Sequence, residues 1–226
     1  MSSPFDLPTT CYNPGAFIRT GMDLLALASE PEVALQWAQP SALDGMSVGA
    51  LAAHGLRMLD EILNDCERPE PATARFRGMV NYSRGARMDQ REDLKNIEGN
   101  RIIIEHAEEQ AAHGPGPVLE KAARSLEQLK WMLPAMDPNK HVFLPRIPPM
   151  TGLLAMMVMN RTVELTVHMD DLAVSVGLPT PPITPEAGAM ALTVLLSVAR
   201  RMNGDLDLLR IMARSERAKP GAARAY

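Results

Sequence analysis

The stretch that decides the fold runs from residue 151 to residue 177 and reads TGLLAMMVMNRTVELTVHMDDLAVSVG. Its apolar residues recur at helical spacing, and a glycine is a common residue just past a helix end. We therefore expect one long helix from Thr151 to about Val176, ending at Gly177. A helix of this length can run through the centre of a helical bundle.

Four charged or ionisable residues of this helix fall on one narrow stripe at about 100° per residue: Arg161, Glu164, His168 and Asp171. Valine, leucine and methionine flank the stripe on both sides. The opposite face carries small or polar side chains that suit solvent: Ala155, Thr162, Thr166, Asp170 and Ala173. The charged stripe is therefore expected at the centre of the buried face.

Burying these charges without partners costs several kcal/mol, so something must compensate them. Glu164 and His168 are four residues apart, which places them one turn apart and lets both reach one ion. A bound metal and a buried ion-pair network both satisfy the pattern. From this helix alone the two interpretations stand about equal.

Further helices are indicated by capping residues, prolines and apolar spacing. They are expected over residues 14–29, 48–63, 97–113, 118–133 and 185–203, with a short last helix beginning at residue 205. Residues 134–149 contain five prolines and little periodicity, so we expect a loop there. The fold class is therefore all-α, with residues 1–177 as a helical bundle of about four long helices. Residues 178–226 form a Pro-rich linker and a small helical C-terminal extension.

The composition fits this class and excludes others. Of 226 residues, 46% are apolar and 22% charged, with 16 methionines and few aromatic side chains. A net charge of -4, without a basic run, argues against nucleic-acid binding. The longest purely apolar stretch is too short for a membrane span. Two cysteines make no disulfide framework and no secretory signal is visible, so a cytoplasmic location is expected.

A third histidine lies in the segment Leu51-Ala-Ala-His54 of the helix expected from residue 48. His54 follows Leu51 by three residues and lies at the edge of the apolar stripe. Taken alone, a border histidine with a hydrogen-bond partner is the commoner interpretation. His106 and His113 are expected on polar helix surface, and His141 in a loop, where an inert role fits each of them best.

Together, these two segments resemble the DinB-like, mycothiol-dependent maleylpyruvate isomerase family. Members show Leu-x-x-His in a helix-opening motif, here ending at His54. More than a hundred residues later they show Arg-x-x-Glu-x-x-x-His-x-x-Asp, here complete from Arg161 to Asp171. Trp37, Pro40-Ser41 and the segment Gly204 to Arg210 also resemble the family. The family usually has Trp where this chain has Met46.

The resemblance implies a DinB-like four-helix bundle in which His54, Glu164 and His168 bind a divalent metal and Asp171 is a polar residue beside it. Two histidines and one glutamate leave a coordination position open, as in catalytic zinc sites. Zinc fits this donor set best, and iron, nickel or manganese remain compatible. The resemblance also implies mycothiol or a related thiol as cosubstrate.

The expected function is a metal-dependent enzyme that uses a low-molecular-weight thiol as nucleophile against an electrophilic substrate. It is either an S-transferase or a maleylpyruvate-type cis-trans isomerase. Asp171 orients His168 or moves the thiol proton, and Arg214 is a candidate cation for an acidic substrate. The alternatives are a metal-dependent hydrolase and a non-catalytic binding or stress-response protein braced by its metal. A homodimer is compatible with the sequence.

Overall fold

The computed structural model describes residues 9–71, 75–76, 78, 97–144 and 150–217. Within these ranges the chain is mostly helical, which confirms the all-α fold class. Among the described residues, no helix combines the length and the apolar character that a membrane span requires.

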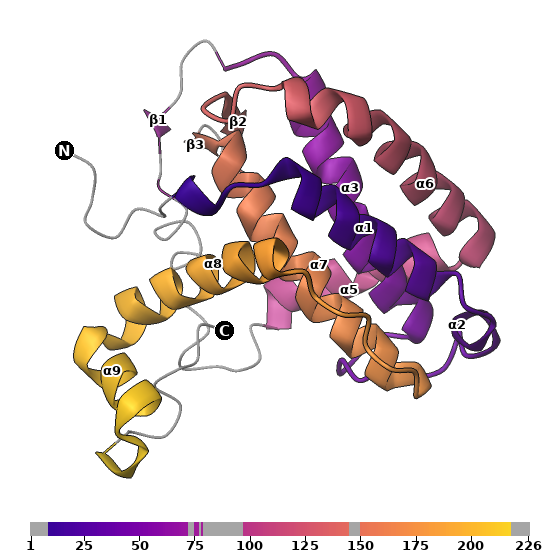
Figure 1. Cartoon of the computed structure of the whole chain (residues 1–226). Helices are drawn as coiled ribbons and strands as arrows, with labels where there is room; N and C mark the ends of the chain where they lie inside the picture. Colours follow the sequence, from indigo (N-terminus) through magenta and orange to yellow (C-terminus); the bar gives the residue numbers. More distant parts are fainter. Residues whose placement is uncertain (1–8, 72–74, 77, 79–96, 145–149, 218–226) are drawn as a thin grey trace.

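Four helices form the central bundle (Figure 1). They are α1 (Pro14–Ala28), α3 (Val48–Glu67), α6 (Pro115–Met132) and α7 (Leu154–Val176). Helices α1 and α3 each pack against both α6 and α7. Phe17, Leu59, Leu129 and Met157, one from each helix, are fully buried where the four meet. The expected four-helix bundle is confirmed, and α3 and α7 lie side by side within it.

Helices α1 and α3 begin, and α7 ends, where the sequence indicates, whereas α3 continues to Glu67, past its expected end at residue 63. Asn13 Oδ1 accepts a hydrogen bond from the Ala16 amide at 3.0 Å and caps α1. Ser47 Oγ caps α3 in the same way through the Ala50 amide. Helix α7 ends at Gly177, whose φ of 72° is a left-handed conformation that glycine adopts without a side-chain clash.

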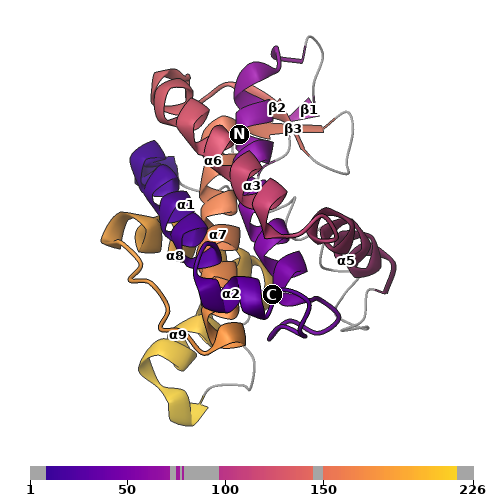
Figure 2. The ribbon, with the colours of Figure 1, turned by 90° about the vertical axis from the view of Figure 1, so that its right-hand side faces the viewer.

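Other helices surround the bundle (Figure 2). They are α2 (Pro31–Leu35), α5 (Ile97–Ala111), α8 (Pro185–Asn203) and α9 (Asp205–Ala213), with short 3-10 turns η1 (Thr9–Cys11), η2 (Leu133–Ala135) and η3 (Ser215–Arg217). Helix α5 packs on α3, α8 packs on α7, and α9 packs on α8.

The segment expected to be a loop contains part of a small three-stranded sheet. Strand β2 (His141–Phe143) pairs antiparallel with β3 (Met150–Leu153), which pairs parallel with β1 (Arg75–Phe76). His141 is therefore in a strand, and α7 begins at residue 154 and not at 151. These strands were not expected because each is too short for an alternating pattern of apolar and polar residues.

Most of the face of α7 expected to meet solvent is buried instead, and of its five residues only Asp170 is exposed. Thr162 is 0% exposed and Thr166 is 4% exposed, because α8 packs along α7. Each hydroxyl donates to the carbonyl four residues earlier, Val158 O and Thr162 O, at 2.9 Å. Since the helix itself satisfies these hydroxyls, they can be buried at little cost. Helix α7 is therefore enclosed on both sides.

Helix α8, in the predicted C-terminal extension, contributes to the main core. Its residues Ala187, Met190, Ala191 and Val194 are buried in the same cluster as the bundle side chains. The division of the chain at residues 177 and 178 stays a prediction, but the first half of α8 shares its core with the bundle.

Candidate metal centre

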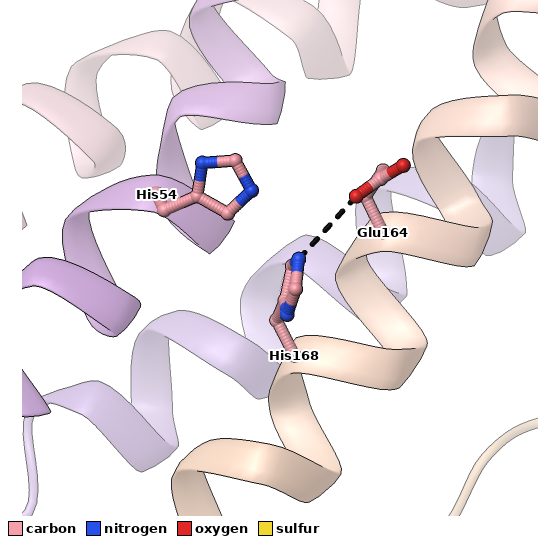
Figure 3. A group of neighbouring side chains, drawn as sticks. All are labelled: His54, Glu164 and His168. Atoms are coloured by element: carbon pink, nitrogen blue, oxygen red, sulfur yellow. Dashed lines mark ion pairs between the residues drawn. The ribbon is translucent and has the colours of Figure 1, made fainter. Parts of the chain in front are cut away.

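The candidate ligands His54, Glu164 and His168 meet between α3 and α7 (Figure 3). His54 projects from α3, while Glu164 and His168 project from consecutive turns of α7. One donor atom of each lies within 4.8 Å of the others. The two imidazole rings are 4.8 Å apart between centroids and meet edge to face at 70°. The structure thus brings together three residues that are far apart in sequence.

The cluster is buried but not sealed. His54 is 8% exposed and His168 is 9% exposed, whereas the Glu164 side chain keeps 24% of its surface. A small molecule could therefore approach the cluster from the side of the carboxylate.

His168 lies between two carboxylates. Its Nε2 is 3.3 Å from Glu164 Oε2, and its Nδ1 is 3.0 Å from Asp171 Oδ2. Burial alone would lower the pKa of His168, but hydrogen bonds to Asp171 and Glu164 raise it to about 9. Without a metal, His168 is therefore an imidazolium at neutral pH, and this charge compensates both carboxylates.

The other two candidate ligands are already in the protonation state that a metal requires. Burial, followed by the charge of His168, lowers the pKa of His54 to about 3. Burial would raise the pKa of Glu164, but the hydrogen bond and charge of His168 lower it to about 2. His54 is thus neutral and Glu164 ionised at neutral pH.

Gly55 allows α3 to pass close to its neighbours at the level of the cluster. A Cβ atom added there would lie 3.1 Å from Leu24 Cδ2 on α1 and 3.4 Å from His168 Cβ on α7. The first distance is tighter than ordinary packing, so an alanine at this position would require Leu24 to shift by a few tenths of an ångström. Gly55 was not among the expected site residues, although its place next to His54 was a signal.

Two members of a charged network one turn from the cluster, Arg57 and Glu61, were also missed. Arg161 Nη2 on α7 is 2.7 Å from Glu61 Oε2 on α3, so an ion pair joins the two helices. Arg57 connects this pair to the cluster, because its Nη2 is 3.4 Å from His54 Nδ1. Arg57 and Glu61 follow His54 by three and seven residues, and that helical spacing was the available signal.

The structure does not bring Arg214 to this cluster. Arg214 follows the end of α9, is exposed and hydrogen-bonds the carbonyl of Ala213. Helix α9 lies beyond α8, away from α3, in both views of the ribbon (Figures 1 and 2). His106 and His113 are exposed, as expected.

One family model matches the part of the chain that contains this cluster. The model for the mycothiol maleylpyruvate isomerase N-terminal domain matches residues 19–173. The chain belongs to this family. The matched region of the mycothiol maleylpyruvate isomerase N-terminal domain contains His54, Glu164, His168 and Asp171, whereas Arg214 lies outside it. A comparison with curated proteins and with solved structures gives no significant match.

The chemistry of these residues fits a divalent metal. Two imidazole nitrogens and one carboxylate are a common donor set for zinc in enzymes. Asp171 hydrogen-bonds the ring nitrogen of His168 that faces away from Glu164, as carboxylates do behind metal-ligating histidines. The same residues also fit the alternative, a buried ion-pair network in which His168 carries the compensating charge.

Proposed function

We propose that the protein is a metal-dependent enzyme in which a low-molecular-weight thiol attacks an electrophilic substrate. The observation that carries the proposal is the convergence of His54, Glu164 and His168 within 4.8 Å, in a chain of the mycothiol maleylpyruvate isomerase family. Three protein ligands leave a position for a small molecule. Zinc is the proposed ion, and when bound it lowers the pKa of a thiol at that position.

The protein's own residues prepare the site. Asp171 holds His168 in one orientation and fixes which ring nitrogen faces Glu164. The Asp171 side chain is 26% exposed, so it can also pass a proton to solvent. This supports Asp171 as the group that orients His168 or accepts the proton of the incoming thiol.

The nucleophilic sulfur is proposed to come from outside the protein. Cys66 lies on α3 twelve residues after His54, about 18 Å along the helix axis. Cys66 is buried, and burial raises the pKa of its thiol to about 11. Cys11 lies in η1, outside the bundle helices that carry the cluster. A thiol cosubstrate such as mycothiol fills this role.

The proposed reaction needs no oxidant or reductant. The thiolate sulfur bonds to one carbon of a substrate double bond that is conjugated to a carbonyl. The electron pair of that double bond moves toward the carbonyl and gives an enolate, which can take up a proton at the neighbouring carbon. In an S-transferase the adduct is the product. In a cis-trans isomerase the adduct rotates about the former double bond, the sulfur–carbon bond breaks and the thiol is released. Both outcomes use the same residues of the chain.

A conjugation assay tests this proposal. The zinc-loaded protein is incubated with mycothiol and a fluorogenic electrophile, and conjugate formation is followed over time. We expect turnover that is lost in Glu164→Ala and retained in Glu127→Ala, a matched change on the exposed side of α6. Turnover of an ester without thiol would favour a hydrolase. Metal binding without any turnover would favour a metal-braced, non-catalytic protein.

A further inference from the structure

Arg57 lies between the candidate ligand His54 and the carboxylate of Glu61. Its Nη2 is 3.4 Å from His54 Nδ1, and its Nε is 3.6 Å from Glu61 Oε1. The Nε atom is buried and has no hydrogen-bond acceptor within the described part of the chain. The guanidinium therefore contacts both the His54 ring and the Glu61 carboxylate, but each contact is longer than a strong hydrogen bond.

The contact with His54 constrains the ring proton. A guanidinium can only donate hydrogen bonds, so His54 Nδ1 is the acceptor, and the single proton of the neutral ring is on Nε2. Figure 3 shows that the ring nitrogen farther from the main chain, Nε2, faces Glu164 and His168. A metal bound there needs Nε2 without its proton, so the proton must move to Nδ1. Nδ1 then becomes a donor. Its contact with Arg57 Nη2 becomes unfavourable because both atoms now carry hydrogens and neither can accept.

Glu61 is placed to take up Arg57 when this contact breaks. Its Oε2 forms an ion pair with Arg161 Nη2 at 2.7 Å, and this pair links α3 to α7. Its Oε1 needs to approach Arg57 Nε by only about half an ångström to reach hydrogen-bond distance. Without Glu61, the positive charge of Arg57 would lose this carboxylate and would lie beside a metal cation.

We infer that Glu61 is a positioning residue for the metal centre, which holds the Arg57 guanidinium away from His54 so that Nδ1 can carry the ring proton. The inference rests on the metal centre of the proposed function. It also predicts a specific rescue. The loss of Glu61 weakens metal binding because Arg57 remains on His54, so removing Arg57 as well restores binding.

The test compares the affinity of four proteins for Co²⁺ alone, by calorimetry and by the visible spectrum of the bound ion. We expect Glu61→Gln to bind about tenfold to a hundredfold more weakly than the wild type. We expect Arg57→Met and the double variant Arg57→Met/Glu61→Gln to bind within about threefold of the wild type. Glu127→Gln on α6 is the control for the loss of a carboxylate.

Two results would overturn the inference. One is wild-type affinity in Glu61→Gln. The other is a double variant as weak as Glu61→Gln, which would show that Glu61 acts only as a strut between the helices through Arg161. A purely structural role predicts no rescue.

A second readout uses the metal-free protein. Imidazole ¹⁵N chemical shifts report which nitrogen of His54 carries the proton. We expect Nε2–H in the wild type and a shift toward Nδ1–H in Arg57→Met. The same tautomer in both proteins would overturn the inference even where Glu61→Gln fails to fold. If the wild type binds no metal but the tautomer shifts, the proposed function fails while the Arg57 contact stands.

Discussion

The two sides of α7 are both polar and both buried, yet they are satisfied in different ways. On the side that faces α8, the hydroxyls of Thr162 and Thr166 donate to carbonyls of their own helix. On the side that faces α3, Glu164 and His168 converge with His54 from another helix. Polar groups that one helix satisfies alone need nothing further. Polar groups that converge from two helices can bind a further partner such as a metal ion, so substitutions on the two sides should have different effects.

Matched substitutions on the two sides should give the largest contrast. Glu164→Ala removes one of three proposed ligands, so we expect metal affinity to fall at least about a thousandfold. Thr166→Ala, two residues away on the other side, should leave the affinity within about threefold. Calorimetric titration with Zn²⁺ checks both. Equal zinc affinity in the two variants would show that the side of α7 facing α3 does not bind the metal.

The pH dependence of metal binding should identify His168 as the ligand that releases a proton. The pKa of His168 is raised to about 9, so the ring is protonated at neutral pH and must lose its proton before Nε2 can bind a metal. Affinity should therefore rise as pH rises, about tenfold per unit and about a hundredfold between pH 6 and 8. His54 and Glu164, with pKa values near 3 and 2, add nothing in this range.

Calorimetry in buffers of different ionisation enthalpy measures the same effect as the number of protons released. We expect about one proton per metal ion at pH 7. A flat pH profile with no proton release would mean that His168 is not a ligand.

Removing the partner of His168 should have a smaller effect. Asp171→Asn keeps the size of the side chain but removes its charge, so His168 is oriented less firmly. We expect metal affinity to fall about tenfold to a hundredfold and the pKa of His168 to decrease. NMR titration of the histidine ring follows the pKa in the metal-free protein. An unchanged pKa would contradict the role assigned to Asp171.

The smallest effect should come from the threonine side. Thr166→Val removes a hydroxyl whose acceptors, Thr162 O and Val163 O, belong to the same helix. Backbone amides also serve these carbonyls, so we expect a change in the free energy of unfolding below about 1 kcal/mol. Urea denaturation measures it, with Thr20→Val on α1 as a comparison. A loss above about 2 kcal/mol would show that the hydroxyl has a further partner.

Local signals in the sequence predicted most of the helices. Four helix boundaries depend on contacts between a capping residue and its immediate neighbours, so they could be inferred from residue type alone. The N-terminal caps are Asn13, Ser47 and Thr184, and Gly177 ends α7. The strands could not, because β2 and β3 are short and form only through pairing between segments. A helical wheel also misjudged Thr162, since polarity alone does not show that a hydroxyl is satisfied within its own helix.

The candidate site was predictable in part. The spacing of Glu164 and His168 indicated a shared ligand or ion pair, but only the family pattern joined His54 to them. Arg57 and Glu61 escaped the sequence analysis because their importance depends on how α3 meets α7. Their spacing from His54 indicates a shared face of α3, but the periodicity of α3 does not show which residues of α7 that face contacts.

Elemental analysis shows whether the chain binds a divalent ion through His54, Glu164 and His168. Wild-type protein and His54→Ala, both purified without chelator, are compared for bound metal per chain by mass spectrometry. The account predicts close to one divalent ion per wild-type chain, most of it zinc, and less than about a tenth of that in His54→Ala. Equal metal content in the two proteins, or none in the wild type after incubation with zinc, would contradict it.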